Sequence, residues 1–352
     1  MPTGNLSNST FLIVSIVKIL IFLFVLLTGV AYTVWLERKV VGHIQNRWGP
    51  TRVGPFGLLQ PLADGLKFIF KEDLTPPYVH KVLYIAAPML ALATSLIAIS
   101  LIPVGAVVNV PNVGATPIQI TDTNISLLII LGVTSIGVYG IALAGWSSNS
   151  KYSMLGALRA ASQMVSYEVA LGLSLVGVLM LTGSFSLRDI VEHQQGAHWW
   201  EFWHWNIFMG GQFVAFFIYI MAAFAETNRV PFDLPEAESE LVAGYHTEYS
   251  SMKFAMFFMA EYANMVTVAC LASILFLGGY SGPVFGPPIL QAVLPVVWFL
   301  LRVVFFLFLY IWVRGTLPRF RYDQLMAFSW KFLLPLSLAN ILITALVVAL
   351  RA

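Results

Sequence analysis

Eight long apolar runs recur along the 352-residue chain, and their length restricts the possible folds more than any other feature. A helix needs about 20 apolar residues to cross the hydrocarbon core of a bilayer. Continuous apolar runs favour helices over the alternating strands of a β-barrel. We therefore expect an all-α integral membrane protein, one polytopic domain over 1–352, with about eight transmembrane helices. The expected spans are 11–36, 81–106, 125–145, 164–184, 208–225 (the shortest), 254–278, 289–312 and 332–350.

The basic residues predict how the spans are oriented. Fifteen of the 19 Lys and Arg residues lie in or at the edge of four connections on one side of the membrane. Basic connections remain in the cytoplasm, so both termini are expected on the periplasmic side of a bacterial inner membrane. No basic segment precedes the first span and no small-residue cleavage site follows it, so we do not expect a signal peptide. The expected cytoplasmic connections are 37–80, 146–163, 226–253 and 313–331.

Acidic residues gather between Ala225 and Ala263, which hold seven of the 17 in the chain although charged residues are only 10% of the whole. A helix N-terminus stabilises one or two acids but not seven. Carboxylates beside a low-dielectric phase with few counter-charges are expected to titrate near neutral pH, as a proton path requires. A purely structural acidic loop is the alternative. The acids are Glu226, Asp233, Glu236, Glu238, Glu240, Glu248 and Glu261.

Two further acids lie at or inside the expected spans. Glu37 follows Trp35 at the end of the first span, where it serves either as part of an interfacial anchor or in function. Glu168 lies about one turn inside the fourth span. A charge at mid-membrane costs about 2.5–3.5 kcal/mol and less near the edge, so Glu168 is expected to have a partner or to snorkel to the interface.

The first cytoplasmic connection contains an amphipathic pattern. Apolar residues recur at helical spacing from Leu59 to Phe70, a stretch too short to span the membrane. We expect a helix on the membrane surface or on a partner. Asp64 lies on its polar side and is expected to pair with Arg38, Arg47 or Lys67.

The sequence contains no motif for a redox centre or a metal site. Cys270 is the single cysteine, and the six histidines show no ligand spacing. No cofactor is therefore expected to be bound by this chain alone, and electrons would have to arrive through a partner.

Five blocks resemble one family throughout. They are ERKVVGHIQNRWGP, GLLQPLADGLKFIFKE, GALRAASQMVSYEV, AETNRVPFDLPEAESELVAGYHTEYSSMKFAMFFMAEY and RGTLPRFRYDQLM, in order between about residues 25 and 340. Together they resemble the quinone-site membrane subunit of respiratory complex I, the proton-translocating NADH:quinone oxidoreductase. This family comprises the H subunit of the bacterial enzyme and its mitochondrial equivalent.

The resemblance implies a function and partners. The subunit would form a quinone tunnel with the hydrophilic arm and start a proton relay into the membrane arm. Quinone would be the substrate, and iron–sulfur clusters and FMN would lie in partner subunits. Implied partners are the hydrophilic-arm subunits, including the one with the terminal iron–sulfur cluster, the small and antiporter-like membrane subunits, and lipids, but no nucleic acid.

The resemblance also assigns residues by position. It places Glu37, Arg38, Arg47, Asp64, Arg314, Arg319 and Arg321 at the quinone tunnel. It places Glu168, Glu226, Glu236, Glu238, Glu240, Glu248 and Glu261 in the proton relay, and Arg229, Asp233, Tyr249 and Asp323 in a supporting polar loop. No residue of this chain is expected to be catalytic itself.

Three alternatives remain open at this point. The chain could be the equivalent subunit of a membrane-bound hydrogenase-type complex, although the full ESELVAG block argues against it. It could be an ion transporter, which predicts inverted repeats that we do not find. It could also be a structural anchor for the hydrophilic arm, in which case neutralising the internal acids would leave activity intact.

Overall fold

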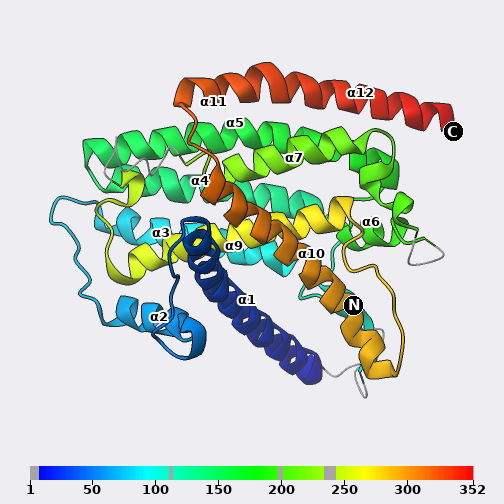
Figure 1. Ribbon diagram of the computed structural model, residues 1–352, viewed down its shortest axis with the longest axis horizontal. Coiled ribbons are helices and arrows are strands. Elements are labelled where there is room, and N and C mark those ends of the chain that lie inside the picture. The colour runs from blue at the N-terminus through cyan, green and yellow to red at the C-terminus, as the bar shows by residue number, and fades with distance from the viewer. Residues whose placement is uncertain (1–7, 111–113, 197–200, 234–242, 352) are drawn as a thin grey trace.

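Membrane-length helices dominate the computed structural model, which describes residues 8–110, 114–196, 201–233 and 243–351 (Figure 1). Seven helical segments in this part of the chain are long and apolar enough to cross a membrane. The expected all-α membrane fold is confirmed. The long helices are α1 (Asn8–Ile44), α3 (Lys81–Ser100), α4 (Ser126–Ser147), α5 (Lys151–Thr182), α9 (Ser251–Phe276) and α10 (Pro288–Thr316), followed by α11 (Tyr322–Phe328), which continues through a π-helical turn (Ser329–Leu333) into α12 (Leu334–Arg351).

The eighth expected span is the apolar helix α7 (Gln212–Glu226). Its 15 residues rise about 22 Å, less than the hydrocarbon thickness of about 30 Å. The chain reaches α7 through a short helix α6 (Leu187–His193) and the 3-10 turns Phe202–His204 and Asn206–Phe208. These elements cover one end of α7, so the short helix does not have to span the bundle alone.

Small residues let the central helices approach closely. A Cβ on Gly140 of α4 would lie 3.0 Å from the backbone nitrogen of Ala91 in α3. A Cβ on Gly145 would overlap the Cβ of Ala157 in α5. Around this centre α12 lies against α5 and α7, while α1 and α10 cross on another side (Figure 1). The first turn of α1 and the last turn of α12 lie at the same end of the bundle.

The amphipathic surface helix is confirmed as α2 (Gln60–Phe70), which follows a 3-10 turn at Pro55–Gly57. No residue of α2 is buried, and Leu62 and Phe70 are 65% and 83% exposed. The apolar face of α2 is therefore available to lipid or to a partner.

Several helices continue beyond the expected spans. α1 runs to Ile44 rather than ending near residue 36, and α5 begins at Lys151, well before residue 164. The polar stretch before residue 164 is helical because Gly156 packs against Gly244, where an added Cβ would lie 2.8 Å from the Gly244 Cα. An antiparallel hairpin of β1 (Gly105–Val110) and β2 (Gly114–Ile118), which the sequence did not predict, follows α3.

Candidate functional site

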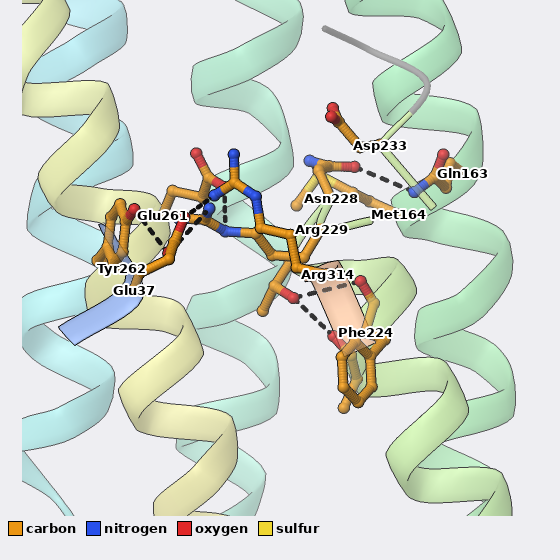
Figure 2. A network of polar contacts seen from close by, with 12 residues as sticks. Glu37, Gln163, Met164, Phe224, Asn228, Arg229, Asp233, Glu261, Tyr262 and Arg314 are labelled. Atoms are coloured by element: carbon orange, nitrogen blue, oxygen red, sulfur yellow. Dashed lines mark hydrogen bonds and ion pairs between the residues drawn. The ribbon is translucent and has the colours of Figure 1, made fainter. Parts of the chain in front are cut away.

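A buried cluster of ion pairs forms where four elements meet at one end of the bundle (Figure 2). Arg229, just after α7, lies at its centre. Its Nε is 2.7 Å from Oε1 of Glu261 on α9, and its Nη1 is 3.6 Å from Oε2 of Glu37 on α1. The three side chains are only 8%, 15% and 11% exposed, so they interact in a medium of low dielectric constant.

Two more side chains complete this cluster. Arg314, near the end of α10, donates a hydrogen bond to Oε1 of Glu37. The Tyr262 hydroxyl donates to Oε2 of Glu37 at 2.9 Å, and its ring lies 4.2 Å from the Arg229 guanidinium carbon. Two arginines thus face two carboxylates, and the charges of the cluster balance. Burial alone would lower the pKa of Arg229, but the carboxylates of Glu261 and Glu37 raise it, so Arg229 remains cationic.

One buried amide holds the loop that presents Arg229. Gln163 on α5 is fully buried, and its Nε2 lies 2.8 Å from the carbonyl oxygen of Ala225 and 2.8 Å from that of Phe232. The same nitrogen is 3.2 Å from Oδ1 of Asn228, whose backbone is left-handed with a φ of 51°. Asparagine tolerates this conformation better than most residues, so the turn at Asn228 aims Arg229 back into the bundle.

The connection after α10 is attached to the same loop. Arg319 Nη2 lies 3.0 Å from Oδ2 of Asp233, and the backbone nitrogen of Phe320 donates to the Pro231 carbonyl at 3.1 Å. The rings of Phe320 and Phe232 stack with centroids 5.6 Å apart. The arginines of this connection are therefore on the same side of the bundle as the acids, as the sequence predicted.

The surface helix α2 is joined to α1 by a second ion pair. Arg38 Nη1 lies 2.7 Å from Oδ2 of Asp64, and Gln60 donates to Oδ1 of Asp64 at 3.0 Å. Of the three partners expected for Asp64, Arg38 is the one the structure places beside it. Glu37 and Arg38 are neighbours on α1, so the helix connects the buried cluster to the surface helix.

Glu248 lies just before α9, beside the segment that leads from α2 to α3. Its carboxylate accepts a hydrogen bond of 2.8 Å from the Tyr78 hydroxyl, and this bond raises the pKa of Tyr78. Its carbonyl accepts one of 2.6 Å from Tyr84. Nearby, burial raises the pKa of Tyr249 to about 12, and its hydroxyl lies 3.3 Å from Oγ of Ser147. Glu248 and Tyr249 thus hold three connections together at this end.

Glu168 and Glu226 lie together in the interior, away from the arginine cluster. Glu168 on α5 accepts a hydrogen bond from Ser135 on α4, and its charge acts on Glu226 at the end of α7. Within the described ranges neither acid forms an ion pair. Glu226 lines a cavity with Thr134 and Asn264 that offers about 20 Å³ to the centres of water-sized molecules, which is room for about one water.

The remaining predicted residues fall into two groups. Arg47, Arg321 and Asp323 are on the surface, where Arg47 bonds to Gln45 and Arg321 pairs with Asp323 at 3.3 Å. The second group lies outside the described residues, so the structure does not test it. These residues are Glu236, Glu238 and Glu240.

Sequence reasoning missed three polar residues that organise the site: Tyr262, Gln163 and Tyr78. Tyr262 directly follows Glu261, which is the one local signal that could have drawn attention to it. Gln163 and Tyr78 contact residues 62 or more positions away, and no spacing along the chain signals such contacts.

Helices of membrane length with arginines and carboxylates buried at one end define a class of protein, the polytopic membrane proteins whose interior carries functional charges. The chain belongs to the NADH dehydrogenase family, whose family model matches residues 17–345. The resemblance inferred from the five sequence blocks is confirmed.

Relatives with high identity cover nearly the whole chain, and all three described here are H subunits of NADH-quinone oxidoreductase. The one from Koribacter versatilis, which carries the copy number 2, is 73% identical over 98% of this chain and 99% of the relative. The one from Solibacter usitatus, which carries the copy number 1, is 49% identical over 97% of this chain and 98% of the relative. The one from Leptospira biflexa is 50% identical over 91% of this chain and 90% of the relative.

Proposed function

We propose that this chain is the quinone-site membrane subunit of a proton-translocating NADH:quinone oxidoreductase. In this role it forms the wall of a quinone tunnel with the hydrophilic arm, and its interior acids start the proton relay into the membrane arm. The observation that carries the proposal is the buried cluster of Glu37, Arg229, Glu261 and Arg314 in a chain of this family.

The cluster suits a site that responds to charge. Its four ionised groups balance, and their burial makes the cluster sensitive to a charge that arrives or leaves nearby, because screening by water is weak there. Reduction of a quinone consumes protons, so it changes the charge at the tunnel. A change of this kind would shift the shared partners of Glu37 and Arg229, and the cluster would pass the change inward.

The next members of the relay would be Glu226 and Glu168. Their carboxylates repel each other, and Glu226 lines the cavity that has room for a water molecule. Two interacting acids without a cation partner in the described part of the chain favour sharing a proton over holding two negative charges. They provide a protonation site between the arginine cluster and the rest of the membrane arm.

The proposal also fixes the orientation and the partners. The end of the bundle that carries Arg229, Glu248 and Arg319 would face the cytoplasm, where the hydrophilic-arm subunits dock, and both termini would be periplasmic. Electrons would arrive from the partner that holds the terminal iron–sulfur cluster. The antiporter-like subunits would receive the proton signal, and lipid would deliver quinone past α2, whose apolar face is exposed.

The test is the Glu37→Gln variant in the assembled membrane complex. We expect NADH:quinone reductase activity and proton pumping to fall at least about tenfold, because a neutral amide cannot hold both arginines. NADH oxidation with a water-soluble artificial acceptor is expected to stay unchanged, because it does not use the membrane subunit. The Glu236→Gln and Glu238→Gln variants test the relay in the same assays and are expected to lower coupled turnover.

The matched control is Glu192→Gln, an acid at the other end of the bundle that pairs with Arg188 and is 55% exposed. It is expected to leave both activities at the wild-type level. Native gels must show equal amounts of complex for each variant. Full quinone reduction and pumping by a correctly assembled Glu37→Gln complex would refute the proposed role of the cluster.

A further inference from the structure

A second cavity lies at the opposite end of the bundle from the arginine cluster. It forms between the loop that joins α9 to α10, the turns before α7 and the first half of α10, and its volume is about 840 Å³. In Figure 1 the α9–α10 loop is on the same side as the start of α1 and the end of α12. Ligand sites for small molecules have volumes of about 300–1,000 Å³, so the cavity can hold one.

Arg302, in the middle of α10, lines this cavity. It donates hydrogen bonds to the carbonyl oxygens of Gly279 and of Ser281, the latter at 2.7 Å. Its guanidinium carbon lies 4.9 Å from the centre of the Trp205 ring. These contacts use two of the five N–H donors of an arginine and fix the plane of the guanidinium.

The walls of the cavity are closely fitted around the ring systems. A Cβ on Gly282 would lie 2.5 Å from the Trp298 ring, and the indole nitrogen of Trp298 donates to the Pro283 carbonyl at 3.1 Å. A Cβ on Gly278, whose φ is +74°, would lie 2.9 Å from the indole nitrogen of Trp205. Both indole rings are therefore held in place by backbone that approaches closely, and the cavity is a formed site rather than a gap between loose side chains.

The charge of Arg302 has no balancing anion in the described part of the chain. Carbonyl groups satisfy hydrogen bonds but leave the positive charge in place. Glu201 also lines the cavity, but its carboxylate lies 3.5 Å from Nε2 of His204 and is not within ion-pair distance of Arg302. A cation within a membrane span is costly unless an anion or water reaches it.

The cavity opens toward the region where lipid lies. Leu301, Phe305 and Val284 line it and are 53%, 58% and 51% exposed. A ligand that enters from this side must have an apolar part to cover these residues and an anionic group to reach Arg302. Free phosphate or a small carboxylate meets only the second requirement.

We propose that this cavity binds the headgroup of an anionic phospholipid. Its phosphate meets the free N–H donors of Arg302, and one acyl chain follows the apolar face of α10 past Leu301 and Phe305. Arginine is suited to this contact because its planar fork binds two phosphate oxygens at once. The aromatic walls from Trp205 and Trp298 are typical of groups that lie at the level of lipid headgroups.

The test uses the assembled membrane complex in phosphatidylcholine vesicles that contain a minority of phosphatidylglycerol with a photoreactive acyl chain. After illumination, labels on residues 277–305 are counted by mass spectrometry. We expect strong labelling, which excess unlabelled phosphatidylglycerol removes and excess phosphatidylcholine does not. Arg302→Gln is expected to lower the labelling about tenfold, the effect of losing one charge-assisted hydrogen bond, whereas Arg302→Lys retains part of it.

The control is Arg188→Gln, which removes an arginine already paired with Asp122 and Glu192 and is expected to leave labelling unchanged. If Arg302→Gln does not assemble, the wild-type competition still decides. Equal competition by phosphatidylcholine, or displacement by inorganic phosphate alone, would overturn the proposal. So would a cross-link from this segment to another protein of the complex in place of lipid.

Discussion

Arg229 offers the sharpest test of how the buried cluster is held together. The Arg229→Gln substitution leaves the Glu261 carboxylate, which is 15% exposed, without the cation 2.7 Å away. Glu37 keeps Arg314 and Tyr262, so the loss falls mainly on Glu261. Removing one partner of a buried ion pair typically costs about 3–5 kcal/mol, because the other charge remains buried. We expect the free energy of unfolding to fall by this amount.

The assay is unfolding of the purified chain in mild detergent by added SDS, followed by the helical circular dichroism signal. The double variant Arg229→Gln with Glu261→Gln removes both charges and is expected to recover about 0.5–3 kcal/mol relative to additive losses. Arg321→Gln is the control, because its pair with Asp323 is 78% and 67% exposed and contributes less than about 1 kcal/mol. A loss below about 1 kcal/mol for Arg229→Gln, or strict additivity in the double variant, would refute this account of the cluster.

Three further outcomes follow from the structure. Glu248→Gln is expected to lower the pKa of Tyr78 toward its ordinary value, since the hydrogen bond to the carboxylate raises it; NMR titration of labelled tyrosine would measure this, and an unchanged pKa would contradict it. Arg319→Gln is expected to cost about 1 kcal/mol, because Arg319 is 43% exposed although Asp233 is buried, and the same SDS titration applies. Gly145→Ala is expected to lose about 1–3 kcal/mol by overpacking α4 against α5, and wild-type stability would show that the helices can separate there.

The sequence predicted the helices well because each span is a local feature. Apolar runs identified seven segments of spanning length and the shorter α7, and helical periodicity identified α2. The ends of α1 and α5 were less predictable because hydropathy reports burial in lipid, whereas a helix continues as long as it finds packing partners. Gly156 against Gly244 is such a partner, and neither residue is apolar enough to extend a predicted span.

The site was predictable in its members but not in its pairings. Reasoning from single acids singled out Glu37 and Glu261, and the family resemblance added Arg229 and Arg314. No local pattern could pair Glu37 with Arg314, which lies 277 positions later in the chain. Tyr262 was missed for the same reason, because a tyrosine in an apolar span is ordinary until its hydroxyl is seen to contact Glu37.

The distance along the chain between the members of the cluster has a consequence for synthesis. Glu37 is among the first residues to enter the membrane, but Arg229 and Arg314 emerge from the ribosome much later. Until they arrive, the carboxylate at the end of α1 has to remain in contact with water or stay neutral, because burying it alone is costly. Only 11% of the apolar window of α1 is buried within the chain, so little packing has to form before the arginines arrive. The first helix to be inserted is therefore expected to be among the last to lock into its final position.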